Sequence, residues 1–378
     1  MKILFVSEYF YPRLAGGELS LWTLCNDLVS RGHKISVITS KMETTKEHEF
    51  INQIEIYRPF SSGNSIMKRI WFLIKLYPYL KTFLGDKEID VIYNLGYVPT
   101  ISTTFIASKY NIPVVTSIQS LLGKMWFKLA NPFLASVNYF MEMFIIRFGK
   151  HDVVQYPSEY TKRMAAPYTK SDAVVIHNPI NVDVMKEMKS FTDTKKTRQS
   201  IGIKEDELFL LFVGLLVRVK NVTGLINALI KLKKKFKLVL VGEGPERGKI
   251  ERLIKELDLD GKVILLGQKP HNETLSIINS CDVLILPSKS ETFSNIVLEG
   301  LALGRPVIST KVGAVPKMKS ENLYLIDNLE EINSILEKNI EPEKDDRVLK
   351  EYSMDKIMGE FEKLFEGVVE GMRGAKNK

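Results

Sequence analysis

Short apolar runs alternate along the chain with longer segments in which apolar side chains recur every three or four residues. The first pattern is typical of buried strands and the second of amphipathic helices. In the first half, the runs predict strands at 3–6, 34–39, 54–57, 91–93, 114–118, 153–156 and 173–176. Helical spacing between them includes the long segments 65–84 and 124–148. This alternation predicts a parallel sheet covered by helices.

The second half begins the same alternation again. Its predicted strands are 208–213, 237–241, 263–266, 283–286 and 307–309. Residues 186–206 between the halves are polar and charged, and we interpret them as a linker. The sequence therefore predicts an α/β protein with one domain over 1–185 and a second over 207–349. A final amphipathic helix is expected over about 350–372.

The composition is that of an ordinary globular protein, with 378 residues of which 45% are hydrophobic and 26% charged. The two cysteines, Cys25 and Cys281, are too few for a disulfide or metal framework. The first residues form too short an apolar run for a signal peptide, and no run of about 20 apolar residues is present. We expect a cytoplasmic protein.

Positive charge is concentrated in one window. The net charge is +8, and residues 61–150 hold ten Lys or Arg against four Asp or Glu, interleaved with many aromatic residues. Such a mixture suits an anionic membrane surface, so peripheral contact with the inner face of a membrane is one hypothesis. A solvated basic face around a core is the other. Nucleic-acid binding would also fit the window, but it does not explain the carboxylates described next, so no nucleic acid is expected.

The predicted loops at the strand ends carry the candidate chemistry. Glu291 follows strand 283–286, and Glu299 lies on the helix that begins near Ser294, among mostly apolar neighbours. A carboxylate in a dry place needs donors, which the hydroxyls of a sugar could supply. Lys220 follows strand 208–213, and Gly16–Gly17 precede the first helix, where N–H groups could approach an anion. Together these residues indicate an anionic, polyhydroxylated ligand.

Several motifs, in this order and spacing, resemble those of family 4 glycosyltransferases with the GT-B fold. They are Gly16–Gly17–Glu18, Asn178–Pro179–Ile180, Phe212–Val213–Gly214, Gly242–Glu243–Gly244–Pro245, Glu291 with Glu299, and Gly304–Arg305–Pro306. The resemblance implies two Rossmann-like domains facing a central cleft, with the terminal helix packing back on the first domain. It also implies transfer of a hexose-type sugar from a nucleotide diphosphate sugar, with retention of configuration, to a glycan or lipid-linked acceptor. No metal or other cofactor is expected.

The resemblance assigns roles residue by residue. Lys220 would neutralise the diphosphate, Glu291 would accept hydrogen bonds from the donor sugar, and Glu299 would accept them from the ribose. The other expected donor contacts are Gly16 and Gly17 at the phosphate, Gly214 and Arg218 in the strand loop, Gln268 near the base, and the backbone N–H groups of Phe293, Ser294 and Asn295.

Two departures from the family pattern leave alternatives open. The family commonly has Arg where this chain has Leu215, and a His near the reaction centre where it has Gln119. Gln119 can hydrogen-bond a sugar but cannot carry a proton near neutral pH. A nucleotide-sugar-binding protein with impaired catalysis and a GT-B sugar-nucleotide epimerase therefore remain alternatives. A dinucleotide-dependent oxidoreductase is disfavoured, because neither half has G-x-G-x-x-G after its first strand.

Overall fold

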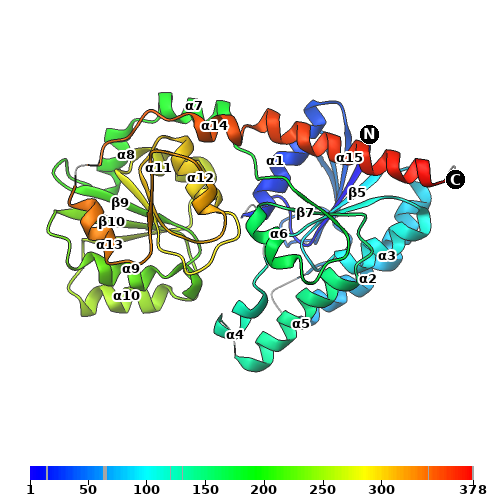
Figure 1. Cartoon of the computed structure of the whole chain (residues 1–378), viewed down its shortest axis with the longest axis horizontal. Helices are drawn as coiled ribbons and strands as arrows, with labels where there is room; N and C mark the ends of the chain where they lie inside the picture. The colour runs from blue at the N-terminus through cyan, green and yellow to red at the C-terminus, as the bar shows by residue number, and fades with distance from the viewer. Residues whose placement is uncertain (14–15, 63–65, 120, 130, 339, 377–378) are drawn as a thin grey trace. The chain divides into compact units, whose positions relative to one another are not determined.

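The computed structural model describes residues 1–13, 16–62, 66–119, 121–129, 131–338 and 340–376, which form two compact units (Figure 1). Unit 1 comprises Met1–Pro179 and Asp355–Lys378, and unit 2 comprises Ile180–Met354. Each unit is an α/β layer structure with its own sheet.

The sheet of unit 1 has the strand order β3-β4-β2-β1-β5-β6-β7-β8. Neighbouring strands are parallel, except that β3 pairs antiparallel with β4. The strands are β1 (Lys2–Ser7), β2 (Lys34–Ile38), β3 (His48–Ile51), β4 (Ile54–Tyr57), β5 (Val91–Leu95), β6 (Val114–Ser117), β7 (Val153–Tyr156) and β8 (Asp172–Val175).

Helices cover both faces of this sheet. They are α1 (Gly17–Ser30), α2 (Ile66–Asp86), α3 (Thr100–Tyr110), α4 (Trp126–Leu129), α5 (Pro132–Phe148), α6 (Glu159–Ala165) and α15 (Met354–Lys376), with a 3-10 turn at Gly123–Met125. Because successive strand residues point to opposite faces, Ile92 packs with α2 and α3 while Tyr93 contacts α15. The rings of Phe361 and Phe365 lie 6.0 Å from that of Tyr93, so the terminal helix is part of unit 1.

Unit 2 has a six-stranded parallel sheet in the order β11-β10-β9-β12-β13-β14. The strands are β9 (Leu208–Val213), β10 (Phe236–Val241), β11 (Val263–Gly267), β12 (Val283–Leu286), β13 (Val307–Thr310) and β14 (Leu323–Ile326). The helices are α7 (Val182–Phe191), α8 (Thr194–Ile201), α9 (Val222–Leu229), α10 (Arg247–Glu256), α11 (His271–Ser280), α12 (Asn295–Ala302), α13 (Glu331–Leu336) and α14 (Arg347–Glu351), with 3-10 turns at Arg218–Lys220 and Val315–Lys317.

Unit 2 has two hydrophobic cores, one on each face of its sheet, and each core contains a different set of helices. Helices α9, α10 and α13 share one core with the sheet, and α7, α11, α12 and α14 share the other (Figure 1). The two ends of the unit meet: the Ile180 N–H donates to the Tyr352 carbonyl (2.7 Å), and the Met354 N–H donates to the Ile180 carbonyl (2.9 Å).

The predicted linker is wrong. Residues 186–206 form most of α7 and all of α8, and they belong to unit 2. Most of their charged side chains are exposed, but Met185 just before them and Ile203 are buried in the core under β9 and β10. Few apolar residues suffice to anchor a surface helix, so the polarity of the segment was misleading. The edge strands β3 and β14 were also missed. In β3 the residues are exposed or half-buried and give only a weak apolar signal, whereas Leu323–Ile326 of β14 is an apolar run that was not predicted as a strand.

None of the helices in the described part of the chain is long and apolar enough to span a membrane. Both cysteines are buried and free.

Candidate functional site

In unit 2, the strand order reverses between β9 and β12, because β10 lies on one side of β9 and β13 on the far side of β12. Open α/β sheets bind ligands at such switch points, outside the carboxyl ends of the strands. The loops that follow β9 and β12 carry Lys220 and Glu291, so the sheet places both residues where this rule predicts a ligand.

Lys220 and Glu291 form an ion pair. The ammonium Nζ of Lys220 donates to Glu291 Oε1 at 2.6 Å, and the Ser288 hydroxyl donates to the same oxygen at 2.7 Å. Both charged side chains are largely buried. Both of these hydrogen bonds, which join described residues, end on Oε1 of Glu291 and leave its Oε2 out. The Lys220 ammonium has three N–H donors, of which this contact uses one. The pair can therefore bind a further acceptor at Lys220 and a further donor at Glu291.

Backbone contacts fix the loop after β9 and the loop after β12 relative to each other. The Lys289 N–H donates to the Val219 carbonyl at 2.8 Å, which joins the loop after β12 to the loop after β9. Behind them, Gly313 has a φ of +57°, and a Cβ there would collide with the Glu291 carbonyl oxygen. The Ala314 N–H also donates to the Thr292 carbonyl at 3.1 Å. The loop that follows β13 thus supports the position of Glu291.

Gly214 lies at the end of β9 with a φ of +154°, and the loop after β10 packs directly on it. A Cβ on Gly242 would overlap the Gly214 carbonyl. The glycine pair therefore brings two strand ends close together.

Glu299 lies on α12 and is only 9% exposed. Burial raises the pKa of its carboxyl to about 8. His271 Nε2, at the start of α11, lies 3.7 Å from Glu299 Oε1, and burial lowers the pKa of this imidazole. Both shifts favour the neutral forms, so at neutral pH an acid and a neutral imidazole face each other. Ligand hydroxyl groups near Glu299 would favour its charged form.

The remaining predicted donor contacts differ in exposure. Phe293 is buried against Tyr352, with ring centroids 5.9 Å apart, and Ser294 is buried at the N-cap of α12. Asn295 is half-buried and begins the helix, so the three backbone N–H groups lie at a helix N-terminus. Arg218 and Gln268 are exposed in the loops after β9 and β11. Leu215, which replaces the expected arginine, is 61% exposed.

Unit 1 has its own pocket at its switch point, between the carboxyl ends of β1 and β5. Its volume is about 290 Å³. Gly17 and Gln119 both line it, and a Cβ on Gly17 would lie 3.5 Å from the Gln119 side chain. The Gln119 amide donates to Ser117 Oγ at 2.9 Å. Gly16, with a φ of +51°, precedes α1 beside this pocket.

Charged residues to which the sequence assigned no role line the same pocket. The Glu8 carboxylate accepts from the Ser62 hydroxyl (2.8 Å) and from Arg69 Nε of α2 (3.1 Å). Burial also raises the pKa of Glu18. Glu8 and His271 each follow a predicted strand within a few residues, and that position was the signal that could have identified them. Arg69 offered no such signal, since it is one of several basic residues on α2.

The structure brings the predicted residues together in two groups, one in each unit. Lys220, Glu291 and Gly214 lie at the switch point of unit 2, and Gly17 and Gln119 lie in the pocket of unit 1. Among the described residues, no three His, Cys, Asp or Glu side chains are grouped as a metal ion would require.

Comparisons with known proteins agree with this division. A family model described as Glycosyltransferase Family 4 matches residues 14–184, and one described as Glycosyl transferases group 1 matches residues 193–356. An uncharacterized glycosyltransferase of Methanocaldococcus jannaschii is 28% identical over 323 residues, which is 83% of this chain and 82% of the relative. The alpha-monoglucosyldiacylglycerol synthase of Streptococcus pneumoniae is 26% identical over 324 residues, covering 82% of this chain and 71% of the relative.

Among solved structures, HepE of Anabaena in complex with UDP-glucose aligns with a TM-score of 0.74 at 18% identity. The alignment covers 97% of this chain and all of that one. This similarity confirms the predicted fold class, because such neighbours are GT-B proteins and both units here are parallel α/β sheets. The two family models, which between them span most of the sequence, show that the chain belongs to glycosyltransferase family 4 and is a transferase enzyme.

Proposed function

We propose that this protein moves a hexose-type sugar from a nucleotide diphosphate sugar to a glycan or lipid-linked acceptor, with retention of anomeric configuration and without a metal. The Lys220–Glu291 pair at the switch point of unit 2 carries this proposal, since it combines a diphosphate-binding cation with a carboxylate for sugar hydroxyls. HepE, whose structure holds UDP-glucose, and the relative named for monoglucosyldiacylglycerol support the donor and acceptor classes.

The chemistry follows from the charges. In transfer, the bond between the anomeric carbon and the diphosphate oxygen breaks, and negative charge develops on the leaving group. Lys220 stabilises that charge where it forms, together with the backbone N–H groups of residues 293–295. Glu291 holds Lys220 in place through its Oε1 and fixes the sugar through its second oxygen. The acceptor hydroxyl proton passes to the leaving diphosphate, because Gln119 cannot take it.

The test begins with a screen of nucleotide sugars for binding and for slow hydrolysis by the purified protein. The best donor is then used to compare the wild type with Lys220→Ala and Glu291→Ala. We expect both substitutions to lower kcat/KM at least ~100-fold, because each removes a group that stabilises the transition-state charge or the group that positions it. Lys231→Ala, at an exposed lysine of the same unit, is the matched control and should retain full activity.

Near-normal turnover by a folded Glu291→Ala protein would contradict the assignment. Donor binding with no transfer to any acceptor would favour the alternative of a nucleotide-sugar-binding protein with impaired catalysis. The exposed Leu215, in place of the expected arginine, is the observation behind that alternative. Interconversion of two nucleotide sugars without an acceptor would favour an epimerase.

A further inference from the structure

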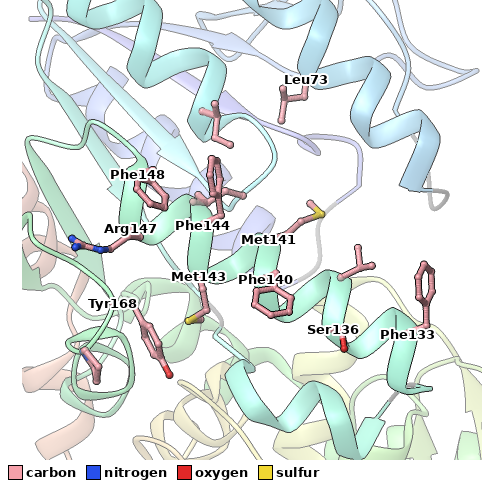
Figure 2. A pocket seen from close by; sticks show the side chains of 14 residues that line it. Leu73, Phe133, Ser136, Phe140, Met141, Met143, Phe144, Arg147, Phe148 and Tyr168 are labelled. Atoms are coloured by element: carbon pink, nitrogen blue, oxygen red, sulfur yellow. The ribbon is translucent and has the colours of Figure 1, made fainter.

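One cavity of unit 1 lies outside both candidate sites. It is a groove of about 840 Å³ in unit 1, formed by α5, by Leu73 of α2 and Ile101 of α3, and by the segment after α6. Figure 2 shows its lining, which is almost wholly aromatic, aliphatic or methionine side chains. Exposed apolar surface that forms a continuous patch often marks a binding site.

Exposed apolar side chains follow helical spacing on α5, which lines the groove, and on α2, which contributes Leu73 to it. On α5, exposed phenylalanines recur at Phe133, Phe140, Phe144 and Phe148, and Phe140 is 67% exposed. On α2, the exposed set is Met67, Ile70, Trp71 and Ile74, and Trp71 is 56% exposed. Since side chains three and four residues apart share a helix face, each set forms one continuous stripe.

The charge around these stripes has one sign. Arg147 lines the groove, and Lys75 Nζ lies 5.8 Å from the centre of the Trp71 ring. Residues 61–85 contain no acidic residue at all, and between 91 and 151 the sequence has a single one, Glu142. Glu142 is buried and accepts the Gly123 N–H, so it does not offset the positive surface.

We propose that this surface, formed by the exposed faces of α2 and α5, docks on a bilayer rich in anionic lipids. The phenylalanines and Trp71 would enter the boundary between headgroups and acyl chains, while Arg147 and Lys75 would meet the anionic headgroups. A second copy of the chain fits less well, because a symmetric contact would place the same positive residues against each other. The proposal goes beyond the transfer reaction and does not depend on the donor sugar.

Co-sedimentation with vesicles tests the proposal directly. The full chain is mixed at low salt with vesicles of phosphatidylglycerol and phosphatidylcholine, or of phosphatidylcholine alone. We expect binding to the mixed vesicles that weakens as salt rises, and much weaker binding to the neutral ones. Phe140→Ser/Phe144→Ser should lower partitioning at least ~10-fold. Lys75→Ala/Arg147→Ala should lower it by on the order of fivefold for each charge.

Matched controls distinguish binding through this surface from nonspecific adsorption to vesicles. Phe50→Ser/Phe191→Ser removes two phenylalanines of comparable or greater exposure on β3 and α7, and Lys231→Ala/Lys255→Ala removes two exposed charges of unit 2. Both should bind within about twofold of the wild type, because neither lies on α2 or α5. Brominated lipid should quench the emission of the wild type but much less that of Trp71→Phe, which keeps the other two tryptophans.

Three results would overturn the proposal. The first is no sedimentation with phosphatidylglycerol vesicles at low salt, and the second is equal binding to neutral vesicles. The third is a wild-type dimer in solution that Phe140→Ser/Phe144→Ser converts to a monomer, which would show that a second copy covers the surface.

Discussion

The two units have the same kind of sheet with a switch point, but they build different surfaces there. In unit 2, the loops after β9 and β12 are joined to each other by the Lys220–Glu291 pair and by the Lys289–Val219 hydrogen bond. In unit 1, the pocket collects side chains from separate segments, including Glu8 after β1, Arg69 on α2 and Gln119 after β6. The Lys220–Glu291 pair is already formed without a ligand, and such a fixed arrangement suits a ligand group that is the same in every reaction cycle. A pocket assembled from independent segments can change with any of them, so we infer that unit 2 defines the reaction and unit 1 the acceptor.

Of the substitutions that test this difference between the units, Gly313→Ala is expected to have the largest effect on transfer. In Gly313→Ala, the new Cβ would push against the Glu291 carbonyl at a positive φ, which we expect to cost ~1–3 kcal/mol and to displace Glu291. Transfer should fall at least ~10-fold by kcat/KM. Gly202→Ala is the control, since Gly202 also has a positive φ (+84°) but open space around it.

If both alanine variants lose the same stability and neither loses transfer, Glu291 does not depend on the loop that follows β13. The tight arrangement of unit 2 would then not matter for activity.

A smaller effect is expected in unit 1 from Gln119→Ala. The substitution removes one neutral hydrogen-bonding group from the pocket, which is typically worth ~0.5–1.5 kcal/mol, or about a two- to thirteenfold loss in acceptor kcat/KM. The dissociation constant of the nucleotide sugar should stay unchanged, because the donor is assigned to unit 2. An equal weakening of donor binding, measured by calorimetry, would contradict the division of roles.

The smallest effect concerns pH and Glu299. Its folded pKa of about 8 lies above the ordinary value of 4.5, so the folded protein keeps a proton that the unfolded chain releases. The stability from this group is complete below about pH 4.5 and is lost as the pH rises through about 8. Glu299→Gln lacks this dependence. The Tm of the wild type relative to Glu299→Gln should therefore fall by a few degrees between pH 5 and 9.

The pH dependence of nucleotide binding tests the protonation state of Glu299 independently. If ribose hydroxyls donate to the Glu299 carboxylate, binding tightens as the pH rises toward 8 in the wild type but not in Glu299→Gln. A constant Tm difference across this pH range would show that Glu299 is already ionised in the folded protein.

The sequence predicted most of the fold because the central strands are buried on both faces. Runs such as 208–213 and 283–286 are wholly apolar, and the structure confirms them with the same bounds. The edge strand β3 and the surface helix α8 have no fully buried side chain and left little pattern to detect, whereas β14 was missed although Leu323–Ile326 is a wholly apolar run.

The candidate site could be predicted only in part. The strand–loop–helix order indicated that Lys220 and Glu291 share one edge of a sheet. Their 2.6 Å contact across 71 residues of sequence depends on strand order, which local patterns do not determine. Ser288 and His271 contribute through side-chain orientation, and Arg69 through its contact with Glu8 across 61 residues. These contacts arise from tertiary packing.

The paired ends of unit 2 have a consequence for how the chain can be divided. Ile180 and Met354 are hydrogen-bonded neighbours, so the two ends of unit 2, which is a continuous insertion in the sequence of unit 1, lie side by side. An excised segment from Ile180 to Met354 would keep its termini together without a designed connection. Unit 1 has the opposite property: its helix α15 is synthesised only after all of unit 2, so its sheet stays without α15 until unit 2 has been translated.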